Sequence, residues 1–139
     1  LDRKKLGGVV FSDPAQLDTL NRIVYFHVRR AVETIRAEKK ACGCALFAVD
    51  AINLIQSGLA SLCDVTVGVT APQEVRLARI MARDGIERRY ALLRIRAQEP
   101  ESYFRTHCSY ILENGEISQE EFQIQAEALL DKIIKENAK

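Results

Sequence analysis

The fold is decided by residues 64–83, which read DVTVGVTAPQEVRLARIMAR. The first seven residues are rich in β-branched side chains, which predicts a strand, and Ala71 and Pro72 end it. Apolar residues then recur at helical spacing from Gln73 to Arg83, so a helix follows the strand after a short loop. A strand, a short loop and a helix in this order indicate an α/β fold.

The same patterns predict the other elements of the chain. They are, in order, a short helix over 2–11 with Asp2 as its N-cap, a long helix from Pro14 to about Lys40, a strand over 44–50 buried on both faces, a helix over 86–98, a strand over 108–113, and a last helix through Ile134 that begins at a capping box of Ser118 and Glu121. Together they predict a doubly wound parallel sheet flanked by helices.

Composition excludes several classes of protein. The chain has 139 residues, 20 Lys and Arg against 19 Asp and Glu, and 47% hydrophobic residues, which is typical of one globular domain. No apolar run is long enough to span a bilayer and no signal region is present, so we expect a cytoplasmic protein with no membrane partner. The cysteines and histidines lack the spacing of metal ligands, so we expect no metal site and buried thiols. The cysteines are Cys42, Cys44, Cys63 and Cys108.

Arginine is concentrated in the middle of the chain. Between Arg76 and Arg96 there are seven arginines, no lysine and only two acidic residues. Arginine used without lysine favours planar, bidentate recognition of phosphate or carboxylate. Two alternatives remain: the arginines are solvated or paired with acids of the last helix, such as Glu120 and Glu127, or they bind a nucleic-acid backbone. The near-neutral total charge of the chain argues against nucleic acid.

Several short motifs follow one another in a definite order along the chain. They are residues 1–7 (LDRKKLG), 10–14 (VFSDP), Asp50, 57–59 (SGL), Arg79, 83–85 (RDG), Arg94, Gln98 and 110–115 (YILENG). In order and spacing they resemble the dephospho-coenzyme A kinases, a family of P-loop kinases of the nucleoside-monophosphate-kinase type.

The resemblance implies a three-layer, P-loop-kinase-like parallel sheet flanked by helices, present here as a single kinase-like domain fragment. Its parts would be a helical acceptor-binding segment over 1–42, core strands over 43–75, an arginine-rich helix and helical lid over 76–106, and the last strand and C-terminal helix over 107–139. The Gly-Lys-Ser/Thr phosphate loop of such kinases does not occur in the sequence. The chain therefore resembles the C-terminal two-thirds of such an enzyme, without the N-terminal P-loop strand.

That missing strand would lie between the strands at 44–50 and 64–70. We expect these two strands to pair directly, to take a strand from another chain in an oligomer, or to belong to a longer protein.

The resemblance also implies an activity, which is transfer of the ATP γ-phosphoryl group, with Mg²⁺, to the ribose 3′-hydroxyl of dephospho-coenzyme A in the last step of coenzyme A biosynthesis. It assigns Arg83 and Arg94 to catalysis, Arg79, Asn114 and Gly115 to ATP binding, and Asp2 and Arg3 to the acceptor substrate. Without the phosphate loop we expect the chain alone to be inactive. The alternative function is a non-catalytic nucleotide-binding, coenzyme A-binding or assembly module derived from the kinase.

Overall fold

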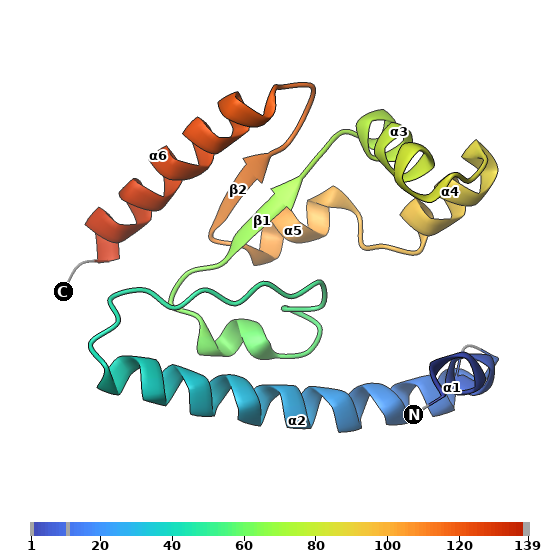
Figure 1. Ribbon diagram of the computed structural model, residues 1–139, viewed down its shortest axis with the longest axis horizontal. Coiled ribbons are helices and arrows are strands. Elements are labelled where there is room, and N and C mark those ends of the chain that lie inside the picture. The colour runs from blue at the N-terminus through green and yellow to red at the C-terminus, as the bar shows by residue number, and fades with distance from the viewer. Residues whose placement is uncertain (1, 11, 138–139) are drawn as a thin grey trace. The chain divides into compact units, whose positions relative to one another are not determined.

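The computed structural model describes residues 2–10 and 12–137, and it divides the chain into two compact units, 1–64 and 65–139 (Figure 1). The elements of the first unit are α1 (Arg3–Val10), α2 (Pro14–Ala41) and a short 3₁₀ helix, η1 (Leu59–Leu62). Those of the second are β1 (Val67–Thr70), α3 (Gln73–Asp84), α4 (Arg88–Arg96), α5 (Glu101–His107), β2 (Tyr110–Glu113) and α6 (Gln119–Asn137). No helix in the described ranges is long and apolar enough to cross a membrane.

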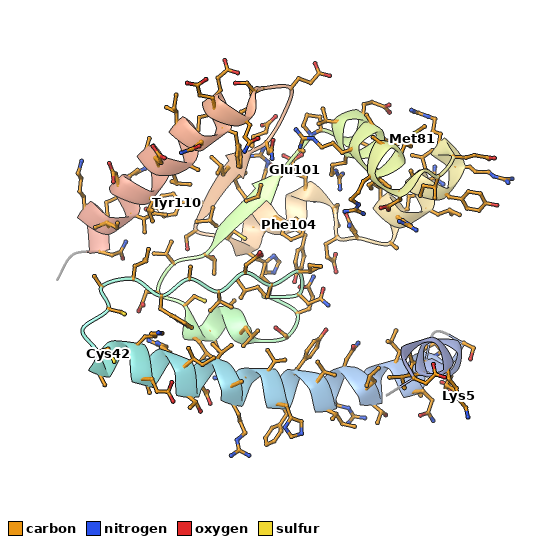
Figure 2. The ribbon with its side chains drawn as sticks, viewed as in Figure 1. Lys5, Cys42, Met81, Glu101, Phe104 and Tyr110 are labelled. Atoms are coloured by element: carbon orange, nitrogen blue, oxygen red, sulfur yellow. The ribbon has the colours of Figure 1, made fainter. Side chains whose placement is uncertain are left out.

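Both α-helices of the first unit begin at an aspartate cap. The backbone N–H of Lys5, labelled in Figure 2, donates to Asp2 Oδ1 at 3.0 Å, which confirms the predicted N-cap of α1. The N–H of Ala15 donates to Asp13 Oδ1 at 2.9 Å at the start of α2. The long helix then ends close to the predicted position, before the left-handed turn at Gly43.

The long helix α2 packs against the segment that follows it. Arg29 donates through Nη1 to the carbonyl of Gly58 at 3.3 Å and to Ser61 Oγ at 3.2 Å. Asn53 donates to the hydroxyl of Tyr25 at 3.4 Å. No residue of the helix is fully buried, and its apolar residues Val24 and Val28 are 43% and 40% exposed.

Residues 44–50 do not form the strand that the sequence predicts. Leu46 is 54% exposed, so the segment is also not buried on both faces. An apolar run becomes a strand only where a neighbouring strand satisfies its backbone N–H and C=O groups. Within the described ranges the sheet consists of β1 and β2, and residues 44–50 join neither strand. The described sheet therefore does not include the expected direct pairing of 44–50 with the strand at 64–70.

The sheet of the second unit is parallel, as predicted, but its strands are shorter. Val67 lies opposite Tyr110, and Thr70 lies opposite Glu113. Gly68 allows close packing on one face, because an added Cβ would lie 3.0 Å from Cδ1 of Ile111. The helix that contacts both strands is α5, which the sequence analysis did not predict. Its Phe104 is labelled in Figure 2.

The last helix, α6, is capped as its sequence predicts. Glu121 N–H donates to Ser118 Oγ at 3.1 Å, and Ser118 N–H donates to Glu121 Oε2 at 2.8 Å. These two bonds confirm the capping box.

At the other end of α6, Glu136 accepts a hydrogen bond from the hydroxyl of Tyr110 on β2. That hydrogen bond raises the pKa of Tyr110 above its usual value.

The cysteines differ from expectation. Cys42 and Cys44 are exposed at and just after the end of α2, and Cys63 and Cys108 are half-buried. Burial raises the pKa of the Cys63 and Cys108 thiols. The prediction of buried thiols is therefore wrong for Cys42 and Cys44, because the surface around them is open.

Candidate functional site

The arginine-rich segment forms a packed pair of helices. Leu77 of α3 is 1% exposed and packs with Ala91 and Ile95 of α4. Met81, labelled in Figure 2, lies on α3 and borders this cluster. The apolar residues that the sequence places at helical spacing thus hold α3 and α4 together. Six of the seven arginines of this segment are exposed around this core, and Arg76 is half-buried.

A glycine joins the two helices. Gly85 has φ 63°, in the left-handed region, and its N–H donates to the carbonyl of Met81 at 3.0 Å. The positive φ and the hydrogen bond end α3 as a glycine C-cap, so α4 can begin three residues later, at Arg88. The connection between the two helices therefore begins directly after Asp84.

Asp84, the last residue of α3, binds two arginines at once. Arg83 donates through Nε to Oδ1 at 2.7 Å and through Nη2 to Oδ2 at 3.0 Å. Arg94 of α4 donates through Nη1 to the same Oδ2. The hydrogen bond from Arg83 is the main cause that lowers the pKa of Asp84, and the charge of Arg94 acts in the same direction. The two arginines predicted to be catalytic are therefore brought together on one carboxylate.

A second ion pair joins the same helices. Arg88 of α4 donates through Nη1 and Nη2 to the two carboxylate oxygens of Glu74 on α3, each at 3.0 Å. This hydrogen bonding lowers the pKa of Glu74 and raises that of Arg88. Both side chains are more than half exposed, so the pair contributes little to stability.

The third predicted arginine, Arg79, binds the turn after β2. Its Nη1 donates to the carbonyl of Asn114, and its Nη2 donates to Asn114 Oδ1 and to the carbonyl of Gly115, all at 3.0 Å. The three residues assigned to ATP binding by resemblance are therefore in direct contact. The guanidinium of Arg79 fixes both the backbone and the side chain of this turn.

Four described arginines of this segment pair with nearby acids rather than with acids of α6: Arg83, Arg88, Arg89 and Arg94. Arg89 pairs with Glu87 at 3.1 Å, and the other ion pairs are those of Asp84 and Glu74 above. The predicted alternative of pairing with Glu120 and Glu127 is therefore wrong. The counterions of these arginines are Glu74 and Asp84 on α3 and Glu87 just before α4.

The residues predicted for the acceptor substrate lie in the first unit. The carboxylate of Asp2 caps α1 through Lys5, so it has a structural role. The side chain of Arg3 lies outside the described part of the structure. Within that part, no group of three His, Cys, Asp or Glu residues could hold a metal ion.

Comparison with known proteins identifies relatives of most of this chain. The family model CoaE, described as dephospho-CoA kinase, matches residues 1–119. A dephospho-CoA kinase of Lactobacillus johnsonii is 31% identical over 82% of this chain and 58% of its own length. One from Thermus thermophilus is 37% identical over 82% of this chain and 55% of its own length.

A solved structure agrees with these matches. A crystal structure of a Thermus thermophilus protein is 33% identical and superposes with a TM-score of 0.72, covering 95% of this chain and 67% of its own. The chain spans a little over half the length of the two curated relatives above. The match over most of this chain, in sequence and in structure, shows that it belongs to the dephospho-CoA kinase family.

Proposed function

We propose that this chain takes part in transferring the γ-phosphoryl group of ATP to the ribose 3′-hydroxyl of dephospho-coenzyme A, the last step of coenzyme A biosynthesis. The observation that carries the proposal is the arginine pair on α3 and α4. Arg83 and Arg94 share the carboxylate of Asp84, so two guanidinium groups face one small region. Family membership supplies the reaction to which such a pair is suited.

Arg83 and Arg94 are proposed to bind the phosphoryl group as it moves. Phosphoryl transfer depends mainly on positioning and on stabilising the charge of the equatorial oxygens, for which one arginine supplies about 10³–10⁵ in rate in related NTPases. The described bonds to Asp84 use two N–H groups of Arg83 and one of Arg94. Each guanidinium has five, and the side chains are 72% and 55% exposed, so an anion can reach the rest.

The turn at Asn114 and Gly115 is proposed to bind the nucleotide, with Arg79 holding the turn in shape. Asp2 and Arg3 are proposed to lie on the acceptor side. The reaction of this family is expected to need Mg²⁺, but Asp84 is unsuited as a ligand because both of its oxygens accept from arginine. Magnesium chemistry is therefore assigned to no described residue of this chain.

The experiment measures phosphoryl transfer by the natural polypeptide that carries residues 1–139. Purified protein is incubated with dephospho-coenzyme A, Mg²⁺ and ATP labelled at the γ-phosphate, and label in coenzyme A is followed over time. We expect Arg83→Lys and Arg94→Lys to lower kcat at least tenfold, because lysine keeps the charge but loses the planar fork. Arg89→Lys on the same helix pair serves as the matched control and is expected to keep the rate within about twofold.

The transfer assay, together with calorimetry, distinguishes the kinase from the non-catalytic alternative. A natural polypeptide that binds ATP or dephospho-coenzyme A in calorimetry, but transfers no label, is a non-catalytic binding module. Binding of neither ligand contradicts both proposals.

A further inference from the structure

We propose that Asp84 is a positioning residue, which assembles Arg83 and Arg94 into one phosphate-binding pair before any ligand arrives. This inference rests on the proposed function of the two arginines. It adds a carboxylate to the site, at a position where a negative charge would ordinarily oppose phosphate binding.

The geometry joins two helices at one atom. Arg83 lies on α3 beside Asp84, whereas Arg94 lies ten residues away on α4, and both donate to Oδ2 of Asp84. The Asp84 side chain is only 21% exposed, while both arginines reach solvent. The carboxylate therefore occupies the inner position, and the guanidinium groups lie between it and solvent. An anion arriving from solvent meets the arginines first.

The place of Asp84 in its helix points the same way. Asp84 is the last residue of α3, where the partial negative charge of the helix end makes a carboxylate unfavourable. Gly85 already ends the helix through its bond to Met81, so Asp84 is not needed as a cap. A carboxylate at this unfavourable position is explained by the two cations that it holds.

Preassembly has a direct consequence for binding. Two free arginines lose much side-chain freedom when they close on an anion, whereas two arginines already held by Asp84 lose less. The trio also keeps a net positive charge of one, so it still attracts phosphate. The two arginines should therefore respond to an anion as a unit.

The Glu74 and Arg88 pair offers a matched control. It joins the same two helices through an arginine–carboxylate pair, here with two hydrogen bonds, but it touches neither Arg83 nor Arg94 in any described contact. Replacing Glu74 therefore tests what loss of one interhelical ion pair does to the helix pair by itself.

The experiment follows the side-chain Nε–H signals of Arg83 and Arg94 by ¹⁵N NMR, in the full chain, while inorganic tripolyphosphate is added. In the unchanged chain we expect both signals to move along one binding curve. In Asp84→Asn we expect binding weakened about tenfold and two separate curves, because misplaced groups lose much of their effect. Glu74→Gln is expected to behave like the unchanged chain, and Asp84→Glu to restore a single curve.

Three results would overturn the inference: unchanged or tighter binding by Asp84→Asn with a common curve, separate curves in the unchanged chain, or no response of either arginine. Backbone amide spectra verify that each variant is folded. If Asp84→Asn is unfolded, the inference is tested by whether Arg83 and Arg94 share one binding curve in the unchanged chain and in Asp84→Glu. Phosphoryl transfer is assayed separately on the natural polypeptide. If the expected NMR result comes without transfer, only the proposed function fails. Transfer that Asp84→Asn leaves unchanged overturns only the role of Asp84.

Discussion

Arg79 holds Asn114 by both its backbone and its side chain: Nη1 donates to the carbonyl, and Nη2 donates to Oδ1, each at 3.0 Å. The two residues are 35 positions apart, and their contact joins α3 to the turn after β2. The bonds use the planar fork of arginine, which presents two nitrogens in fixed directions. Arg79 of the arginine-rich segment thus holds the turn at Asn114 and Gly115 in shape.

Replacing Arg79 should loosen this turn. We expect Arg79→Lys to lower the free energy of unfolding by about 1–2 kcal/mol, because one ammonium cannot make the three bonds of the guanidinium. Urea unfolding followed by circular dichroism measures the loss, and the amide signals of Asn114 and Gly115 should also broaden or shift. Arg96→Lys on α4 is the control and should change stability by less than about 0.5 kcal/mol. Equal losses in the two variants would contradict the role given to Arg79.

The core of the α3 and α4 pair should be sensitive to truncation. We expect Leu77→Ala to cost about 2–4 kcal/mol, because Leu77 is 1% exposed and its removal leaves a cavity between the helices. Leu93→Ala, on the same helix pair but 61% exposed, should cost less than about 0.5 kcal/mol. Urea unfolding of the two variants makes the comparison, and similar costs would show that Leu77 is not the packing centre.

Acid should weaken the interhelical pairs. Arginine holds the pKa of Glu74 and of Asp84 below the ordinary values near 4. A carboxylate with a lowered folded-state pKa stabilises the fold above its unfolded pKa, and this contribution is lost as the pH falls through the folded value. The free energy of unfolding should therefore decrease below about pH 4.

Carboxyl ¹³C NMR titration measures both pKa values directly. Glu74→Gln is expected to remove part of the acid dependence, while the pKa of Asp84 stays low. An ordinary pKa for Asp84 in the unchanged chain would contradict its pairing with the two arginines.

The capping box of α6 gives a local test. Ser118→Ala removes the acceptor of the Glu121 N–H and should cost about 1 kcal/mol, with fraying of the first turn. Ser118→Thr keeps a hydroxyl and should lose much less. Amide hydrogen exchange in the first turn of α6 distinguishes the two variants, and equal protection would show that the hydroxyl is not needed.

Local patterns in the sequence were enough to predict most helices. The apolar spacing around Leu77, the aspartate before α1 and the capping box at Ser118 each depend on residues within one or two turns. The parallel direction of the strands also followed from the order of strands and helices, but the pairing of β1 with β2 was not predicted. For the site, the motifs placed Arg79 and Asn114 in one function, and the structure brings them into contact.

Two features that were not predicted depend on distant partners, whereas a third, α5, has a local signal. Residues 44–50 have the composition of a strand, but no described neighbour supplies the hydrogen bonds. The short helix α5 could have been found from Pro100 and from the pairing of Glu101 with Arg105 four residues later. Asp84 had no assigned role, because its contact with Arg94 on another helix depends on how α3 packs against α4.

The central claim is that Arg83 and Arg94 bind the phosphoryl group while it is transferred from ATP to dephospho-coenzyme A. The most direct measurement is transfer of label from γ-labelled ATP to the 3′-hydroxyl of dephospho-coenzyme A by the natural polypeptide, with Arg83→Lys and Arg94→Lys beside it. We predict labelled coenzyme A from the unchanged protein and at least tenfold less from either variant. No label in coenzyme A from the unchanged protein, or undiminished transfer by both variants, would contradict the account.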